Sequence, residues 1–537
     1  MNFNPNFNPY PSRRQVIYGK NGMVATSQPL AAQAGLDMLK KGGNAIDAAI
    51  ATAACLTVVE PISNGIGGDA FALCFIKGEL HGLNASGPTP KNISIDHVKK
   101  WGHEKMPTLG WIPVTVPGVP SAWSALSRKF GKLPLIDVLE PAIKYAREGY
   151  PVSPLISHYW QKLFDYYEEH ACKKAFKEWY NVFAPLGRAP LPGEVWCSEG
   201  HAKTLEEIGR SHAESFYRGE IASQIVAESK KNGGFFELSD LADYKPEWVK
   251  PVHVNYRGYE VWELPPNGQG IIALSALNIL KELSFTNREQ TGTLHTQIEA
   301  LKLAFTAGKH AITDPKYTDT DQIANLLSAT FARESVEKIG HKAADPGDVA
   351  MPKGGTVYLC TADHEGNMVS YIQSNYLGNG AGVVIPETGI AMQNRGCEFK
   401  LDPAHPNALA GGKKTYHTII PGFLTKAGHA IGPFGVMGGY MQPQGHVQLL
   451  MNIIDFGLNP QMALDAPRFQ WMEGRTVEIE KDFPTHIAEA LIARGHEIKV
   501  NLDTSWFGRG QMIWRNPENH VLLGATESRC DGAVVAY

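Results

Sequence analysis

The chain has 537 residues, of which 43% are hydrophobic and 19% are charged, and its formal net charge is −4. That length and apolar content suffice for a large core and, on length alone, for two or three domains. Basic and acidic residues are interspersed and form no basic stripe of the kind that nucleic-acid-binding proteins present. The composition therefore excludes nucleic acid as the expected partner.

The cysteines and the apolar segments of the sequence indicate in which cellular compartment the protein is expected. The seven cysteines are widely spaced and form no Cys-x-x-Cys motif, which is typical of a reducing compartment and not of a disulfide framework. Residues 1–14 contain no apolar segment of the secretory type, and no run of 18 apolar residues occurs elsewhere. We expect a soluble, cytoplasmic protein with no membrane partner.

The first part of the chain predicts two helices and a β-hairpin. Residues 30–41 form an amphipathic pattern that ends at a Gly-Gly pair. Asn44 is a plausible N-cap for an Ala-rich helix over residues 45–59, which is apolar on nearly all faces. Such a helix should be buried against a sheet. A strand over residues 70–75 then turns through Lys77-Gly78-Glu79.

The rest of the chain mixes helices and strands. Residues 141–244 are mainly of helical pattern, and residues 252–264 predict two paired strands. A long amphipathic helix is expected over residues 291–312. Residues 344–355 form a linker rich in Pro, Gly and Asp, after which strands and glycine turns continue to Gly439.

A Gly354-Gly355-Thr356 sequence stands where that linker meets a predicted strand. In this strand Val357, Leu359 and Thr361 alternate with Tyr358 and Cys360. An N-terminal-nucleophile hydrolase needs this arrangement, because the chain must break before a hydroxyl residue that then presents its side chain and its new α-amine. The free amine can act as the base for the neighbouring hydroxyl. By local turn chemistry alone, however, Gly-Gly-Thr is far more often a plain turn.

The sequence does not match other common catalytic or cofactor-binding motifs. Residues 411–415 resemble a phosphate-binding loop, but Lys414 stands where that motif needs Ser or Thr. Residues 65–68 are Gly-rich but precede a strand, whereas a dinucleotide fingerprint follows one. The histidines do not cluster at metal-ligand spacing. We predict neither a metal nor a cofactor.

A series of short matches, in order along the chain, identifies a family. They include Gly42-Gly43-Asn44-Ala45-Ile46-Asp47-Ala48-Ala49, Val59-Glu60-Pro61, Gly65-Ile66-Gly67-Gly68, Thr356, Asp363, Gly366-Asn367, Gly438-Gly439, Ala466-Pro467-Arg468 and Asp531-Gly532-Ala533. From about Gly22 to Ala533 the chain resembles the γ-glutamyltranspeptidases (glutathione hydrolases), which are threonine-nucleophile members of the N-terminal-nucleophile hydrolase superfamily.

The resemblance implies an α+β fold, a four-layer αββα sandwich of the N-terminal-nucleophile hydrolase type. It also implies a proenzyme that cuts itself between Gly355 and Thr356. The two pieces, residues 1–355 and 356–537, would remain partners in one interleaved domain. A glycine before the cut suits the strained backbone of an N→O acyl shift.

The resemblance also implies catalytic roles. Thr356 corresponds to the nucleophile and, through its α-amine, to the base. Gly438 and Gly439 correspond to the glycines whose N–H groups form the oxyanion hole. Ser374 corresponds to the hydroxyl residue that hydrogen-bonds the nucleophile.

Substrate recognition departs from the family pattern. Glu398 stands where relatives bind the substrate α-amine, and His417-Thr418 where they hold the α-carboxylate end. Tyr376 replaces a usual asparagine. Residues 83–90 lack the arginine that pairs with the α-carboxylate in well-studied relatives. Residues 399–416 are shorter than in lid-bearing members, which predicts an open acyl pocket.

Arg395, three residues before Glu398, is the nearest cation by sequence. We predict that it takes the α-carboxylate, or the terminal carboxylate of a glutaryl-type donor. The alternative is an ion pair with a structural carboxylate such as Glu387 or Asp402.

Two functional hypotheses follow. The first is a self-cleaving enzyme that transfers γ-glutamyl or glutaryl-like groups from amides such as glutathione to water or an amino acid. It would belong to a divergent branch with glutathione-hydrolase-like and cephalosporin-acylase-like proteins. The second is a catalytically silent relative that binds a small acidic ligand or acts as a scaffold.

Overall fold

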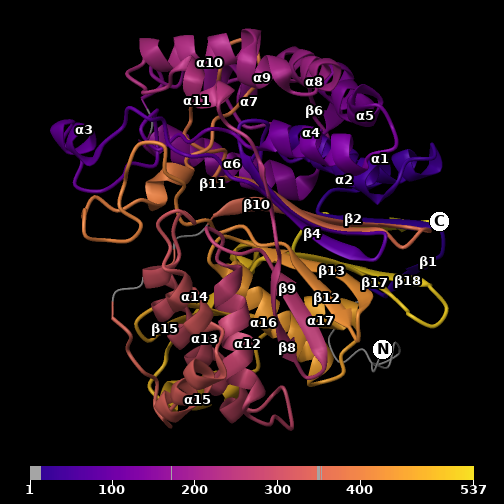
Figure 1. The fold of residues 1–537 in the computed structure, drawn as a ribbon, viewed down its shortest axis with the longest axis vertical. Coiled ribbons are helices and arrows are strands. Elements are labelled where there is room, and N and C mark those ends of the chain that lie inside the picture. Colours follow the sequence, from indigo (N-terminus) through magenta and orange to yellow (C-terminus); the bar gives the residue numbers. More distant parts are fainter. Residues whose placement is uncertain (1–13, 171, 348–350, 352–353) are drawn as a thin grey trace.

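Two stacked antiparallel sheets form the centre of the computed structural model, which describes residues 14–170, 172–347, 351 and 354–537 (Figure 1). We name them the β10 sheet and the β13 sheet. The β10 sheet has the order β19 (Ala533–Ala536), β2 (Gly22–Thr26), β10 (Gly355–Asp363), β11 (Met368–Tyr376), β3 (Asp69–Ile76), β4 (Glu79–Ala85) and β7 (Glu247–Val249). The β13 sheet has the order β1 (Ile17–Gly19), β18 (Leu522–Thr526), β17 (Arg509–Arg515), β13 (His429–Met437), β12 (Gly422–Lys426), β9 (Tyr259–Glu263) and β8 (Val252–Tyr256).

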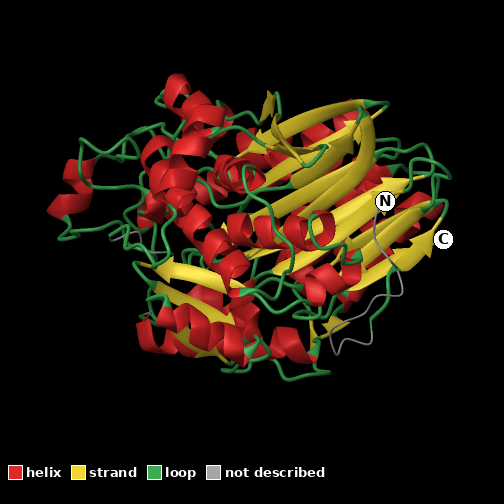
Figure 2. Ribbon diagram, turned by 90° about the horizontal axis from the view of Figure 1, so that it is seen from below, coloured by secondary structure: helices red, strands yellow, loops and turns green. Residues whose placement is uncertain are grey.

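Helices cover the outer face of each sheet, which gives four layers (Figures 1 and 2). The helices over the β10 sheet are α1 (Pro29–Lys40), α2 (Ala45–Val59), α4 (Val119–Phe130), α5 (Leu135–Glu148), α6 (Pro154–His170), α7 (Lys177–Phe183), α8 (Glu199–Ser211), α9 (Glu214–Arg218), α10 (Glu220–Lys231) and α11 (Leu238–Ala242). Those over the β13 sheet are α12 (Gly270–Lys281), α13 (Thr291–Ala311), α14 (Thr320–Leu326), α15 (Ala329–Lys338), α16 (Met441–Ile454), α17 (Pro460–Asp465) and α18 (Thr485–Ala493). The fold is thus the expected αββα sandwich.

Smaller elements lie around this core. They are α3 (Ile95–Lys100), the 3₁₀ turns η1 (Arg395–Glu398) and η2 (Thr504–Phe507), the pair β5 (Tyr150–Pro151) and β6 (Val195–Trp196), and the strands β14 (Phe469–Glu473), β15 (Thr476–Glu480) and β16 (Glu497–Asn501).

The alternation of side chains in β10 divides the core into layers. Tyr358, Cys360 and Ala362 belong to the apolar cluster between the two sheets, whereas Val357 and Leu359 pack against the helices. Thr356 is on the same face of β10 as Tyr358. Its hydroxyl is therefore placed between the sheets, close to the start of β10.

Helix α2 shows why the local prediction was successful. The Asn44 side chain accepts hydrogen bonds from Ile46 N and Asp47 N, and the Asp47 carboxylate accepts one from Asn44 N at 2.9 Å. This capping box satisfies N–H groups at the start of the helix that lack intrahelical partners. Every residue of α2 is buried, and the helix packs on β10 and β11 as predicted.

The other predicted elements agree with the structure. Helices α1 and α13, the β3–β4 hairpin and the β8–β9 pair fall where the patterns placed them, and residues 141–244 are mainly helical. Residues 1–13 and parts of the 344–355 linker (348–350 and 352–353) lie outside the described residues. Within the described ranges, no helix combines the length and the apolar character that crossing a membrane requires.

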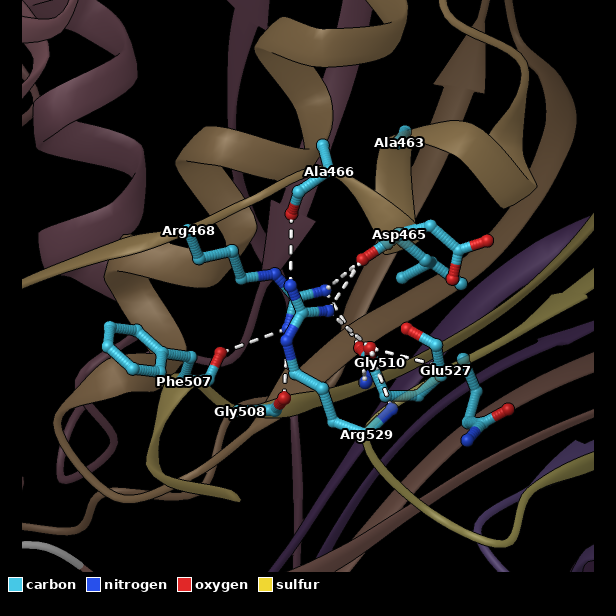
Figure 3. A network of polar contacts seen from close by, with 12 residues as sticks. Ala463, Asp465, Ala466, Arg468, Phe507, Gly508, Gly510, Glu527 and Arg529 are labelled. Atoms are coloured by element: carbon cyan, nitrogen blue, oxygen red, sulfur yellow. Dashed lines mark hydrogen bonds and ion pairs between the residues drawn. The ribbon is translucent and has the colours of Figure 1, made fainter. Parts of the chain in front are cut away.

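A buried ionic network fastens the C-terminal segment to the β13 sheet (Figure 3). Glu527 accepts from Arg468 Nη2 at 2.8 Å and from Arg529 Nη1 at 2.5 Å. Arg529 also donates to Glu480 through Nε and Nη2. Arg468 Nη1 donates to the carbonyls of Phe507 and Gly508, so the network also holds the turn that precedes β17. The two buried arginines thereby balance two buried carboxylates.

Replacing Glu527 by Gln should destabilise the protein strongly, because two buried arginines would lose one shared carboxylate. We expect a loss of about 3–5 kcal/mol in the free energy of unfolding. Urea denaturation followed by tryptophan fluorescence measures it. The matched control is Glu497→Gln, which breaks an exposed pair with Arg475 and should cost less than about 1 kcal/mol. Equal losses in the two variants would contradict this account.

Candidate active site

The site begins at an irregularity between β10 and β11. Gly355 pairs with Tyr376 and Val357 pairs with Gln373, so two β11 residues, Ser374 and Asn375, stand opposite the single residue Thr356. Thr356 Oγ1 donates to Ser374 Oγ at 3.1 Å and also lies 2.6 Å from the carbonyl oxygen of Gly355. The hydroxyl of Thr356 is thus held beside the peptide bond that precedes it.

The hydroxyl oxygen of Ser374 is surrounded by hydrogen-bond donors. Its Oγ accepts from Tyr376 N at 2.8 Å and lies 3.4 Å from Arg395 Nη2. A serine hydroxyl has one proton, and here it is donated to the Gly355 carbonyl oxygen at 2.7 Å. The arrangement polarises the Gly355 carbonyl at the place where Thr356 would attack.

Arg395 is fully buried next to these hydroxyls. Its Nη1 donates to Thr418 Oγ1 at 2.7 Å, and its guanidinium lies over the Tyr376 ring, 3.9 Å from the centroid. Its Nε has no hydrogen-bond partner, and no described carboxylate, Glu387 and Asp402 included, forms an ion pair with it. Burial lowers the pKa of Arg395. The structure therefore offers a buried cation with no described carboxylate at ion-pair distance, although the charges of Asp69 and Glu398 act on it, and the ion pair with Glu387 or Asp402 is not formed.

The backbone of Tyr376 is unusual at this point. Its φ is +77°, a conformation that non-glycine residues rarely adopt. This turn directs the Tyr376 hydroxyl to the Glu398 carboxylate, while its ring covers Arg395. Tyr376 and Arg395 are thereby arranged as one unit.

Glu398, at the end of η1, has two phenol partners. It accepts from the hydroxyls of Tyr376 and, at 2.7 Å, of Tyr440. Tyr440 stacks on Tyr416, and Lys309 of α13 lies 4.2 Å above its ring centroid. Burial lowers the pKa of Lys309 to about 8.

These aromatic rings correct one prediction. We expected an open acyl pocket because the 399–416 segment is short, but Thr356, Arg395 and Thr418 are at most 1% exposed. The rings of Tyr376, Tyr416 and Tyr440 pack around Arg395 and Glu398. The length of the 399–416 segment could not predict this packing, because it carries no information about which side chains cover the site. We name the buried polar cluster that Arg395, Thr418 and Glu398 form, together with the tyrosine rings around it, the Arg395 recess.

His417 lies behind the recess and contacts Asp69. Its Nδ1 accepts from Ile419 N at 3.3 Å, so its Nε2 carries the proton and faces the Asp69 carboxylate at 3.1 Å. Burial lowers the pKa of His417 and raises that of Asp69 to about 7. Both ring nitrogens of His417 are therefore engaged, which leaves Thr418 as the member of the predicted pair that contacts Arg395.

Gly438 and Gly439 form a turn at the end of β13, with φ values of +137° and +60° that favour glycine. Neither N–H donates to a backbone carbonyl of the described residues. The turn approaches the scissile region, since a Cβ on Gly354 would lie 3.5 Å from Gly439 Cα. Among the described residues these two N–H groups therefore have no backbone acceptor, and the turn that carries them lies beside Gly354.

Gln269 is a site residue that sequence reasoning missed. Its Nε2 donates to the carbonyls of Thr418 at 2.6 Å and Gly439 at 2.9 Å, and its Oε1 accepts from Tyr416. It therefore links the Arg395 recess to the glycine turn. The only signal in the sequence was its place just after the Pro265-Pro266-Asn267-Gly268 motif.

The segment that lacks the expected arginine is neutral and polar. Asn84 Nδ2 donates to Asn267 Oδ1 at 2.9 Å, and Ser86 Oγ donates to Asn84 Oδ1 at 2.7 Å. Asn267 Nδ2 in turn donates to the carbonyl of Thr415. These amides bond to one another and supply no positive charge.

One group outside the site has metal-ligand chemistry. His295, Glu299 and His496 place their ligand atoms within 4.8 Å of one another, although the two histidines are 201 residues apart. The Lys302 ammonium already pairs with Glu299 at 2.9 Å, and His295 is hydrogen-bonded to His496 and to Gly340. This group anchors the chain before the 344–355 linker.

Comparisons with known proteins agree with this geometry. The γ-glutamyltranspeptidase family model matches residues 31–537. The glutathione hydrolase-like YwrD proenzyme of Bacillus subtilis is 36% identical, over 97% of this chain and 99% of that protein. The oxamate amidohydrolase proenzyme of Klebsiella pneumoniae is 34% identical, over 96% of this chain and 98% of that protein.

A solved structure is also similar over the whole length. The crystal structure of cephalosporin acylase from Bacillus halodurans is 58% identical, with a TM-score of 0.95, over 100% of this chain and 99% of that one. The chain belongs to the γ-glutamyltranspeptidase family, and with it to the amide hydrolases and acyltransferases that are made as proenzymes.

Proposed function

We propose that this protein cuts itself between Gly355 and Thr356, and that Thr356 then transfers the acyl group of a carboxylate-bearing amide to water or to another amine. One observation carries the proposal: Thr356 and Ser374 meet at the Gly355 carbonyl, Arg395 contacts Ser374 from the other side, and this buried guanidinium has no bonded carboxylate among the described residues. A substrate carboxylate would supply that missing partner.

Self-cleavage follows from the contacts in the intact chain. The Thr356 hydroxyl adds to the carbonyl carbon of Gly355, and the C–N bond then breaks with transfer of the hydroxyl proton to the Thr356 nitrogen. Ser374 donates to the carbonyl oxygen on which negative charge develops. Water hydrolyses the resulting ester, which leaves a Gly355 carboxylate and a free α-amine on Thr356.

The same atoms serve the second reaction. The α-amine of Thr356 takes the proton of the Thr356 hydroxyl, and the hydroxyl oxygen attacks the amide carbonyl of the donor. The amine half of the donor then receives that proton and leaves, so that the acyl group stays on Thr356. Water, or a second amine, then removes the acyl group. We assign the oxyanion of this step to the N–H groups of Gly438 and Gly439, because they have no backbone acceptor in the described chain.

The donor is proposed to be of the γ-glutamyl or glutaryl kind. Arg395 and Thr418 would hold its carboxylate, and Glu398 would hold an amine when one is present. Among the relatives, oxamate amidohydrolase is named for an amide whose acyl group carries a carboxylate, and others are named for glutathione. These names support an anionic acyl group without identifying it.

Thr356→Ala should remain a single polypeptide, because no hydroxyl is left to attack Gly355. The wild-type protein should give two pieces, residues 1–355 and 356–537, when its mass is measured after incubation. Thr356→Ser, which keeps a hydroxyl, is the matched control and should still split. Cleavage of the alanine variant at the same bond would contradict self-cleavage, and an uncut, inactive wild-type protein would favour a catalytically silent relative.

Ser374→Ala should slow self-cleavage by about 100-fold or more, which is typical for the loss of one oxyanion donor. The rate is read from the loss of full-length chain on denaturing gels. Ser374→Thr retains the hydroxyl and should cut at a rate near that of the wild-type protein. An unchanged rate in the alanine variant would remove Ser374 from the cleavage step.

Arg395→Ala should weaken the binding of donors that carry a terminal carboxylate. We expect their KM to rise roughly 10- to 150-fold. This corresponds to a loss of about 1.5–3 kcal/mol in binding free energy, because one charged hydrogen-bonding partner is removed. Glutaryl anilide and its uncharged analogue butyryl anilide form the matched donor pair, assayed on protein that has completed self-cleavage. Arg395→Lys, which keeps the charge, should lose less. Equal changes in KM for both donors would show that Arg395 is structural.

A further inference from the structure

A cavity adjoins the scissile bond, and its lining differs from the residues of the Arg395 recess. It has a volume of about 400 Å³ and is lined in part by Gly354, Gly355 and Met437, the residue before the glycine turn. Arg395, Thr418 and Glu398 are not among its described lining residues. Because Gly354 and Gly355 line this cavity, a molecule bound in it would lie beside the bond that Thr356 attacks.

One wall of this cavity is a face of helix α6. Tyr159, Leu163 and Tyr166 recur at the spacing of neighbouring helix turns and all line the cavity. Tyr166 is 40% exposed, whereas Tyr167 is buried against Trp179, with ring centroids 4.2 Å apart. Trp506 of η2 adds another ring to the lining. A concave surface lined in this way favours a ring-bearing or apolar ligand.

Arg509 gives the cavity a polar contact. Its Nη1 donates to Glu60 at 2.8 Å, and its Nη2 lies 3.4 Å from Ser63 Oγ. Its Nε has no partner in the described part of the chain, although the residue is only 6% exposed. A buried N–H without an acceptor is costly, so an oxygen atom of a ligand would be stabilised there. Glu60 already balances the charge of Arg509.

We infer that this cavity is the subsite for the amine half of the donor, and that it selects ring-bearing amines that carry an oxygen acceptor such as a carboxylate. The inference rests on the proposed function, which assigns the acyl carboxylate to Arg395. With the acyl chain in the Arg395 recess, the other substituent of the reacting carbon faces the α6 wall. When the bond from Thr356 Oγ1 to the acyl carbon forms and the C–N bond breaks, the proton passes to the amine, which leaves through this cavity.

The test varies the two halves of the donor independently. γ-Glutamyl amides of methylamine, aniline and 4-aminobenzoate change only the amine, and glutaryl anilide changes only the acyl group. Tyr166→Ala removes an exposed ring of the wall, and Arg509→Lys keeps a positive charge beside Glu60 but has no Nε–H. Tyr18→Ala, at another exposed tyrosine, on edge strand β1 and outside the cavity lining, is the control.

We expect Tyr166→Ala to lower kcat/KM about 5-fold for the two aromatic amides, since one aromatic contact is lost, and to leave the methylamide unchanged. Arg509→Lys should affect the 4-aminobenzoate amide more than the anilide. Tyr18→Ala should match the wild-type protein with every donor. Equal losses with all three amines, or losses that follow the acyl group, would overturn the assignment.

Calorimetric titration of self-cleaved protein with free 4-aminobenzoate separates this inference from the proposed function. Binding that Tyr166→Ala weakens would support the subsite even if no donor were turned over, and that lack of turnover would contradict the proposed function alone. Absence of binding at millimolar concentration in the wild-type protein would overturn the subsite.

Discussion

The pairing of β10 with β11 is the constraint on which the rest of the site depends. Two residues of β11 oppose Thr356, and this irregularity brings the Ser374 hydroxyl to the Gly355 carbonyl. Both strands are central in their sheet, with helix α2 packed over them. A shift of one residue would turn Thr356 toward the helices and remove it from Ser374. The precision of the site is therefore a property of the sheet register.

Two kinds of buried arginine show how this protein uses charge. Arg468 and Arg529 are bonded to Glu527 and Glu480, so their charges are neutralised inside the fold. Arg395 instead has Thr418, Ser374 and the face of Tyr376 as neighbours. The first arrangement stabilises the fold, whereas the second leaves electrostatic attraction available for a ligand. Burial and residue type are the same in both, and only the partners distinguish them.

Local signals in the sequence predicted much of the fold. The start of α2 follows from Asn44 and Asp47, which are three residues apart in the chain and form the capping box. The family resemblance pointed to Thr356 and Ser374, its missing arginine directed attention to Arg395 near Glu398, and the structure brings Thr356, Ser374 and Arg395 together. What could not be predicted depends on contacts between distant segments. Gln269 meets Gly439 across 170 residues, and Asp69 meets His417 across 348. Likewise, the length of residues 399–416 could not predict that aromatic rings enclose the Arg395 recess.

The strand order of the β10 sheet has a consequence for the lifetime of the protein. β11, β19 and all of β10 except Gly355 come after the proposed cut, whereas β2 and β3 come before it, and in the order β19-β2-β10-β11-β3 strands of the two pieces are interleaved. The pieces can separate only if the sheet is dismantled. An intact chain folds in a single-molecule process, but two severed chains would have to find each other again, at a rate that depends on concentration. Once cut, the protein would retain a structure that it can no longer readily regain, and its durability would be set by how slowly it unfolds.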